Sequence, residues 1–311
     1  MSRTYFRRSS GRARTVRGDL ISQAQESLKQ SGHYRYTVDG VFGEKTENVL
    51  IAFQLEKGLA PTGQLDEETW RAAVSQTPPD IEGRCLQLTA DFEGTGFTKA
   101  VGNFDGAGVT WGIIGFTLSN GELQRVLNDI RSRHAELFRE SFGALAGEMN
   151  EILDASIGRQ MQWAREISVG RSKYKILREW AEAFERLGSR GEVKAVQLEH
   201  TEKYWRIARS DFAEFGLQSE LGLALCFDTA VQNGGIDPAE ARRIHMLVEG
   251  SPPRNEEELR VIIAGVIAAS SRPRYAEDVR SRKLTLATSR GEVHLSAYDL
   301  KTWGLDDEKA T

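Results

Sequence analysis

Glycine is concentrated in one stretch of this chain, where six of the twenty residues from 93 to 112 are glycine. Glycine weakens helices and allows the positive φ angles that tight turns require, so this stretch predicts short strands and turns. Apolar residues recur at helical spacing farther along the chain. They predict helices over 119–140, 142–168, 171–188, 191–214, 218–233, 238–249 and 255–270. The expected fold is therefore mainly α, with a short β-hairpin region in the larger domain.

The composition is that of a globular protein. Of 311 residues, 40% are hydrophobic and 28% are charged, which excludes wholesale disorder and is enough for two domains. The net charge of −4 argues against nucleic acid as a partner. The longest apolar run, 261–269, is too short to span a bilayer, so we expect no stable membrane insertion.

Cysteine and histidine give no sign of a metal site. The five histidines are scattered, and neither a CxxC nor an HExxH spacing occurs, so no metal and no other cofactor is expected. Cys85 and Cys226 both lie among apolar residues. That setting favours two buried free thiols, with a single disulfide as the alternative.

The first third of the chain predicts a small separate domain. Asp19 can cap a first helix, the glycines of 38–43 form a turn, and a second helix begins near Glu44. Gly58 is placed to end that helix, and Asp66 to start a short third one. The expected domain boundaries are a basic flexible arm at 1–17, the three-helix bundle at 18–76, a proline-stiffened linker at 77–84, the larger domain at 85–305 and a tail at 306–311.

Arginine dominates the first seventeen residues, which contain no acid. The six are Arg3, Arg7, Arg8, Arg12, Arg14 and Arg17. A solvated flexible arm is the plainer interpretation, and an arm that contacts an anionic envelope surface is the alternative. No apolar segment follows these charges, so we expect synthesis in the cytoplasm without a Sec signal peptide.

The small domain resembles the three-helix peptidoglycan-binding domain that occurs on many cell-wall hydrolases. The matching residues are Asp39, Gly40, Phe42, Gly43, Thr46, Phe53, Gln54, Gly58, Leu59, Thr62, Gly63, Asp66, Thr69 and Trp70. Most of them shape turns or fill a core. The resemblance implies binding to peptidoglycan without identifying the residues that contact the glycan.

Two carboxylates in the glycine-rich stretch are candidates for acid–base chemistry. Glu93 lies where an apolar segment meets glycines, and the rings of Phe92 and Phe97 are expected to desolvate it. Desolvation raises the pKa of a carboxyl, as a general acid requires. Asp105 lies in a glycine-flanked turn, where it is expected to stay ionised. Cleavage of a glycosidic bond needs this division of roles.

The segment from Asp105 to Phe116 resembles the catalytic stretch of the glycoside hydrolase family 46 chitosanases, members of the lysozyme superfamily. The resemblance implies that Glu93 is the general acid, Asp105 the base and Thr110 a residue that holds the attacking water. The spacing from Glu93 to Asp105 is shorter than in that family, and Ala107 stands where a charged residue is common. These departures bear on specificity for chitosan more than on the fold.

Further candidates lie outside this segment. Leu223–Gly235 resembles the family's buried helix, whose aspartate belongs to a charge network, and it equally resembles a helix with an asparagine near its end in other lysozyme-like muramidases. A buried Asp228 would need Arg206 or Arg209 as its partner. Two aromatic and two amide side chains are candidates for binding sugar rings and acetamido groups: Trp111, Tyr204, Gln232 and Asn233.

The leading hypothesis is a peptidoglycan hydrolase, endolysin-like and monomeric, that cleaves β-1,4 bonds between aminosugars at the cell wall or in the periplasm. Phage-type release or delivery as a secreted effector would bring it there. The alternatives are a chitosanase, a lytic transglycosylase and a non-catalytic wall-binding protein. The first two would use Glu93, whereas the last would use neither carboxylate.

Overall fold

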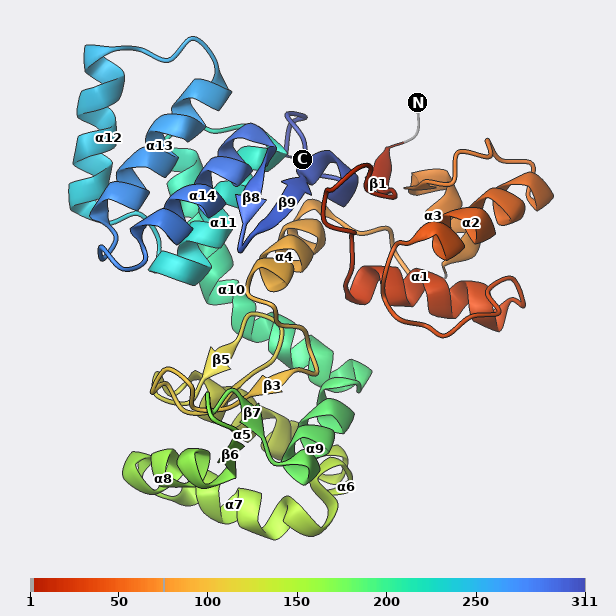
Figure 1. Ribbon diagram of the computed structural model, residues 1–311, viewed down its shortest axis with the longest axis vertical. Coiled ribbons are helices and arrows are strands. Elements are labelled where there is room, and N and C mark those ends of the chain that lie inside the picture. Colours follow the sequence, from red (N-terminus) through yellow and green to blue (C-terminus); the bar gives the residue numbers. More distant parts are fainter. Residues whose placement is uncertain (1–2, 75, 311) are drawn as a thin grey trace. The chain divides into compact units, whose positions relative to one another are not determined.

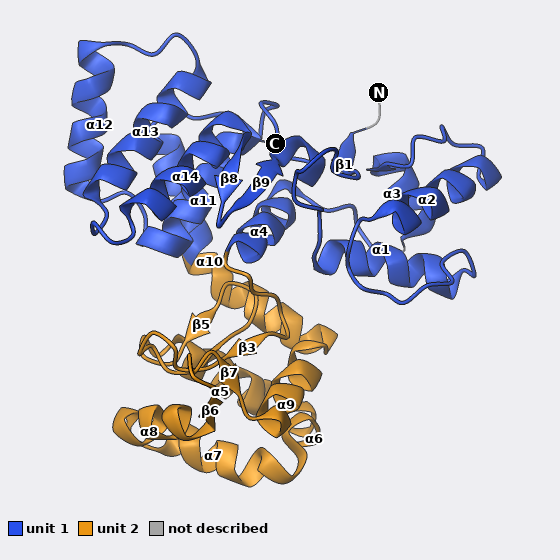
Figure 2. Cartoon of the chain, viewed as in Figure 1, with its two compact units in different colours: residues 1–92, 204–311 blue, residues 93–203 orange. Residues whose placement is uncertain are grey.

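The computed structural model describes residues 3–74 and 76–310. Helices dominate it, and the few strands form small antiparallel sheets (Figure 1), which confirms the mainly α prediction. The chain forms two compact units (Figure 2). Unit 1 contains residues 1–92 and 204–311, and unit 2 contains residues 93–203. This division does not follow the domain boundary expected at 77–84, because the early residues pack with the last part of the chain.

The beginning of unit 1 is the expected three-helix bundle. Its elements are β1 (Thr4–Phe6), α1 (Asp19–Gln30), α2 (Glu44–Glu56), β2 (Leu65–Asp66) and α3 (Glu67–Ala73). Two fully buried glutamines fasten its turns to its helices. Gln25 accepts a hydrogen bond from the amide of Gly40 at 2.8 Å, and Gln54 accepts one from the amide of Gly63 at 2.9 Å. The backbone of the helix cannot reach these turn amides, so the glutamine side chain supplies their hydrogen-bond acceptor.

The predicted flexible arm is wrong for the residues that the structure describes. β1 pairs with β2 in an antiparallel sheet. Arg14 donates a hydrogen bond to Asp91 at 3.0 Å, and Arg3 pairs with Glu220 and Glu308. The arm has no acid of its own, but carboxylates from distant parts of unit 1 meet its arginines. Reasoning from neighbouring residues in the sequence cannot identify such distant partners.

Residues 204–214 of helix α10 (Gly191–Glu214), five further helices and a hairpin complete unit 1. The further elements end with a 3-10 turn. They are α4 (Ile81–Phe92), α11 (Glu220–Asn233), α12 (Pro238–Gly250), α13 (Glu256–Ser270), α14 (Ala276–Thr288), β8 (Arg290–Val293) and β9 (Ser296–Asp299), followed by the 3-10 turn η2 (Leu300–Trp303). α4 takes up the last four residues of the predicted linker. Neither α14 nor the β8–β9 hairpin was expected. α14 was missed because it buries charged side chains and so lacks an apolar face.

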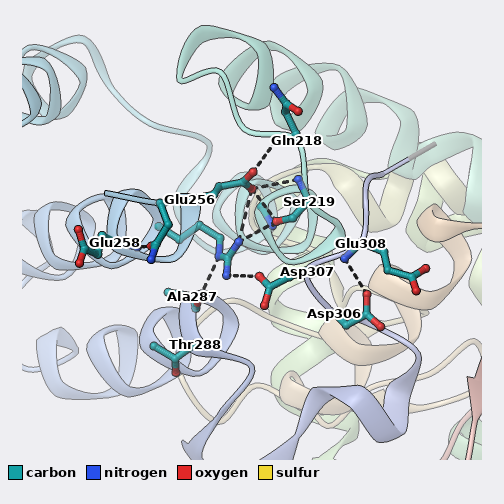
Figure 3. A network of polar contacts seen from close by, with 12 residues as sticks. Gln218, Ser219, Glu256, Glu258, Ala287, Thr288, Asp306, Asp307 and Glu308 are labelled. Carbon is teal, nitrogen blue, oxygen red and sulfur yellow. Dashed lines mark hydrogen bonds and ion pairs between the residues drawn. The ribbon is translucent and has the colours of Figure 1, made fainter. Parts of the chain in front are cut away.

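The predicted tail is part of the fold. The amide of Glu220 donates to the carbonyl of Glu308 at 2.9 Å, and the amide of Ala310 donates to that of Gln218 at 2.8 Å. Beside it, the buried Arg260 donates to Asp307 and to the carbonyl of Ala287, at 2.6 and 2.9 Å. Figure 3 shows this network, in which Glu256 accepts from Ser219 and Gln218. The end of the chain therefore closes the N-terminal side of α11.

Unit 2 surrounds two small sheets with helices. The first sheet has the order β3 (Ala100–Val101), β4 (Thr110–Trp111) and β5 (Phe116–Thr117), and the second pairs β6 (Ser168–Val169) with β7 (Lys175–Ile176). The helices are α5 (Glu122–Arg133), α6 (Ala135–Phe142), α7 (Ala146–Asp154), α8 (Ile157–Ile167), α9 (Arg178–Gly188) and the first part of α10 (Gly191–Glu214), with the 3-10 turn η1 (Gly143–Leu145).

The expected helices of unit 2 are divided more finely than the sequence indicated. The prediction for 119–140 covers α5 and most of α6, and the prediction for 142–168 covers η1, α7 and α8. The start of the 171–188 prediction is a turn followed by strand β7. The helix expected at 191–214 is confirmed without change. Buried apolar residues keep a helical spacing across the break between α5 and α6, from Ile130 to Phe138 and Phe142, so the pattern does not mark where either helix ends.

Two further findings concern the chain as a whole. Within residues 3–74 and 76–310, no helix is long and apolar enough to cross a membrane. Cys85 and Cys226 are buried free thiols, and burial raises the pKa of each of them. They are therefore held as protonated, unreactive groups.

Candidate active site

Glu93 directly follows the last residue of α4 and is exposed. The rings of Phe92 and Phe97 are 1% and 9% exposed, so both are buried in the core. The expected enclosure of Glu93 by these two rings is therefore wrong. Gly94 has a φ of +61° and turns the chain immediately after the carboxylate. This turn keeps Glu93 at the surface, where a substrate can reach it.

Asp105 lies at the tip of the loop that joins β3 to β4 and is also exposed. Its Oδ1 accepts a hydrogen bond from the amide of Ala107 at 3.0 Å. Asn103 closes the loop by accepting from the amide of Gly108 at 3.0 Å. A side chain at Gly108 would come within 2.8 Å of Leu118, and φ there is +83°, so only glycine fits. The second oxygen of Asp105 is left for other partners.

Thr110 begins β4 and is partly exposed. A Cβ at Gly115 would lie 3.2 Å from the methyl of Thr110 and 3.5 Å from the methyl of Thr95, so these two threonines flank the same glycine. The hydroxyl of Thr95 also donates to the carbonyl of Ile113 at 2.9 Å. The segment that carries Glu93 is therefore fixed beside the strand that carries Thr110.

Gln197 on α10 reinforces this junction, and it was not among the residues predicted from the sequence. It is fully buried. Its Oε1 accepts from the amide of Ile113 at 2.9 Å, and its Nε2 donates to the carbonyl of Phe97 at 3.0 Å. The side-chain amide of Gln197 thus links Phe97, four residues after Glu93, to Ile113, three residues after Thr110. The place of Gln197 beside the buried Val193 and Val196 was the one available signal.

A row of side chains connects the surroundings of Glu93 with those of Asp105. The ammonium group of Lys99 donates to the carbonyl of Gly94 and lies 5.6 Å from the ring centre of Tyr174. The ring of Tyr174 in turn packs against that of Phe104, with centres 5.2 Å apart. Phe104 precedes Asp105 in the chain. The two candidate carboxylates are therefore at the ends of one contiguous group of contacts in unit 2.

Asp228 in unit 1 is a buried charge, as expected, but its predicted partners are wrong. Arg282 donates to it through Nε and Nη2, at 2.9 and 2.6 Å, and Lys283 donates to it at 2.6 Å. Arg206 is exposed, and Arg209 pairs with Glu82 at 2.6 Å. Burial raises the pKa of Asp228, but its two cations outweigh burial and lower it overall. The partners were missed because α14 was not predicted.

The four predicted glycan-binding residues divide between the units. Trp111 in unit 2 is fully buried and packs against Phe184, with ring centres 5.5 Å apart, so its prediction as a stacking residue is wrong. Tyr204, Gln232 and Asn233 belong to unit 1. Tyr204 and Gln232 are half-buried, and Asn233 is exposed. Their roles stay predictions, as does the absence of a metal or cofactor.

Comparison with known proteins identifies the N-terminal bundle. Residues 17–73 match the family model of the peptidoglycan binding domain. The N-acetylmuramoyl-L-alanine amidase CwlM of Mycobacterium tuberculosis is 42% identical over 55 residues. That match covers 18% of this chain and 14% of the amidase. The expected resemblance of this segment to peptidoglycan-binding domains is therefore confirmed.

Two solved chitosanases are similar to a larger part of the chain. One is the family 46 chitosanase of Gynuella sunshinyii in complex with chitotetraose, with a TM-score of 0.49 and 17% sequence identity, covering 72% of this chain and 99% of that one. The other is a chitosanase complex with a TM-score of 0.46 and 17% identity, covering 71% of this chain and 95% of that one.

Proposed function

We propose that this protein is a glycoside hydrolase that cleaves β-1,4 bonds between the aminosugars of peptidoglycan. Glu93 protonates the leaving oxygen, Asp105 takes a proton from the attacking water, and Thr110 positions that water. The peptidoglycan-binding match over residues 17–73 supports the polymer. The sequence resemblance of Glu93 and of the Asp105–Phe116 segment to the family 46 chitosanases supports the chemistry.

The local geometry suits such a reaction. An acetal is stable until its leaving oxygen receives a proton while a nucleophile attacks the sugar carbon. The observation that carries the proposal is the junction at Gly115 and Gln197, because it ties the Glu93 segment to the strand of Thr110. Acid and water-holding residue are then part of one rigid framework, which lowers the entropic cost of reaching the transition state.

The direct test is the release of reducing ends from purified peptidoglycan by the full chain. Glu93→Gln removes the acid without changing the shape of the side chain, and we expect its rate to fall about 10²- to 10⁴-fold. Because Glu93 is exposed, unfolding by urea should be unchanged. Glu148→Gln on α7, which is also exposed and lies in the same unit, is a matched control and should retain full activity. A Glu93→Gln variant as active as the wild type would refute the assignment.

Mass spectrometry of the products separates the alternatives. Reducing N-acetylated ends indicate hydrolysis, whereas anhydro ends indicate a lytic transglycosylase, which uses no attacking water and would remove the roles of Asp105 and Thr110. Soluble chitosan as a second substrate tests the chitosanase alternative. Binding to sacculi with no product from either polymer would leave only the wall-binding function.

The site of action follows from the substrate. Peptidoglycan lies outside the cytoplasmic membrane, so we propose that the protein acts at the cell wall or in the periplasm after release or delivery, as endolysins and secreted effectors do. The binding domain holds the enzyme on the insoluble polymer and raises the local substrate concentration. We propose a monomer, because a single chain supplies the carboxylates and the threonine.

A further inference from the structure

The turn between β6 and β7, together with the first residue of β7, is strongly basic. Arg171, Lys173 and Lys175 are all exposed, and in the part of the chain that the structure describes none of the three forms an ion pair. Lys173 donates to the carbonyl of Ser168 at 3.0 Å, within the same hairpin. No acidic residue occurs from 167 to 178. The positive charge of this turn is therefore not neutralised by its neighbours in the chain.

This basic turn is bound to the loop that carries Asp105. The amide of Gly102 donates to the carbonyl of Tyr174 at 2.8 Å, and the amide of Asn103 donates to the hydroxyl of Ser168 at 2.9 Å. A Cβ at Gly102 would lie 2.4 Å from the carbonyl oxygen of Lys173. The two backbones thus approach as closely as glycine permits, and the turn forms a fixed edge beside Asp105.

Aromatic rings occupy the same edge. Phe104 is 50% exposed and Tyr174 is 40% exposed, although their rings contact each other. Large apolar side chains that stay exposed beside a reactive group commonly mark a binding surface. An open ring can pack against the apolar face of a sugar while cations bind acidic substituents. Lys99, above the ring of Tyr174, adds a fourth cation.

We propose that Lys99, Arg171, Lys173, Lys175, Phe104 and Tyr174 form a cationic aromatic rim that selects an anionic glycan. This inference rests on the proposed function and specifies the substrate class. Peptidoglycan carries carboxylates on its peptide stems and on lactyl groups that bear no stem, whereas chitosan carries ammonium groups. From 94 to 121 the only acid is Asp105 itself. The rim therefore attracts the first polymer and repels the second.

The test reverses two charges of the rim in the full chain. Arg171→Glu combined with Lys175→Glu changes exposed side chains only. We expect kcat/KM for peptidoglycan to fall at least about tenfold at low salt, with a smaller loss at high salt because ions screen the interaction. Arg242→Glu combined with Arg243→Glu on α12 changes the net charge equally and is the matched control. It should stay within about twofold of the wild type.

Two further measurements make the outcome decisive. Peptidoglycan with chemically amidated carboxyl groups should be a poorer substrate for the wild type and should show no difference between the wild type and the rim variant. Cleavage of native peptidoglycan that is unchanged in the rim variant would overturn the rim while leaving the proposed function intact. A wild type that prefers chitosan would also overturn it.

If the wild type cleaves neither polymer, the proposed function fails, and binding then tests the rim alone. In that case the retention of soluble muropeptides by the rim variant and by the α12 control is compared. Weaker retention by the rim variant alone supports the rim, and equal retention overturns it. Both proteins keep the same peptidoglycan-binding domain, so its contribution cancels.

Discussion

The carboxylates of unit 1 and those of the candidate site in unit 2 lie in opposite surroundings. Asp228 and Glu220 are 0% and 1% exposed, and each contacts two cations. Glu93 and Asp105 are exposed beside glycine turns. A buried carboxylate needs permanent partners because removing its charge from water is costly. It is therefore committed to the structure, whereas an exposed carboxylate can be reached by a substrate.

The largest effect that this comparison predicts is on stability. Asp228→Asn leaves Arg282 and Lys283 buried without their anion, so the free energy of unfolding should fall by about 3–5 kcal/mol. Asp105→Asn, at an exposed site, should change it by no more than about 0.5 kcal/mol. Urea denaturation of both variants measures this difference. Equal losses of unfolding free energy in the two variants would mean that burial does not decide how much a carboxylate contributes to stability.

The pH dependence of the Asp228 contribution has a definite sign. Because its two cations lower its pKa in the folded protein, its ionised form stabilises the fold above the unfolded-state pKa of about 3.9. This stability is lost as the pH falls through the lower, folded-state pKa. The difference in stability between the wild type and Asp228→Asn should therefore shrink in strong acid, and a difference that grows there would contradict the assignment.

A buried amide sharpens the comparison within unit 2. Gln197→Glu keeps the acceptor for the amide of Ile113 but places a carboxylate against the carbonyl of Phe97. We expect a loss of about 1–3 kcal/mol in stability and a fall in kcat with KM nearly unchanged. Acidic pH should partly restore kcat, because a protonated carboxyl can again donate to that carbonyl. The measurement is a pH profile of kcat on peptidoglycan.

The matched control is Gln54→Glu in the binding domain, whose glutamine is equally buried and also joins a helix to a turn. It should lose similar stability while kcat on soluble glycan fragments stays unchanged. If both variants lose kcat in parallel with stability, Gln197 supports the fold in general and does not position Glu93 and Thr110.

The last predicted effect is a modest gain in stability. Asp211 on α10 is 7% exposed, and burial raises its pKa to about 6 despite the hydrogen bond from the amide of Ile236. Its ionised form is therefore disfavoured in the folded protein, and stability falls as the pH rises from about 4 to about 6. Asp211→Asn should stabilise the protein by about 1–2 kcal/mol at pH 7. The gain in thermal unfolding should disappear near pH 4, and a gain that persists there would have another cause.

Local signals in the sequence predicted the parts of the fold that depend on local chemistry. Glycines marked the turns around Gly63 and Gly108, and apolar spacing marked α10 and α11. The missed parts depend on partners that are distant in sequence. α14 has no clear apolar face because Arg282 and Lys283 point inward toward Asp228, and the arm appeared flexible because Glu220 lies far along the chain.

The candidate site shows the same limit. The position of Asp105 in an exposed glycine turn followed from the sequence, because the turn residues surround it. The surroundings of Glu93 did not, because whether Phe92 and Phe97 face the core or the carboxylate is decided by packing. Gln197 was missed because a single buried glutamine on a long helix forms no repeating pattern in the sequence. The basic turn that contains Arg171 was missed because a helix was predicted over 171–188.

The arrangement of the units in the sequence affects the order of folding on the ribosome. Unit 2 is one continuous segment, residues 93–203, whereas unit 1 needs residues from both sides of it. Asp228 obtains its neutralising partners only after α14 has been translated. A nascent chain can therefore fold the segment with Glu93 and Asp105 first, and the helices that bury the Asp228 cluster assemble last. A ribosome that stalls before α14 would leave a chain with a formed acid–base loop and an unneutralised anion, a species that quality-control proteases should remove.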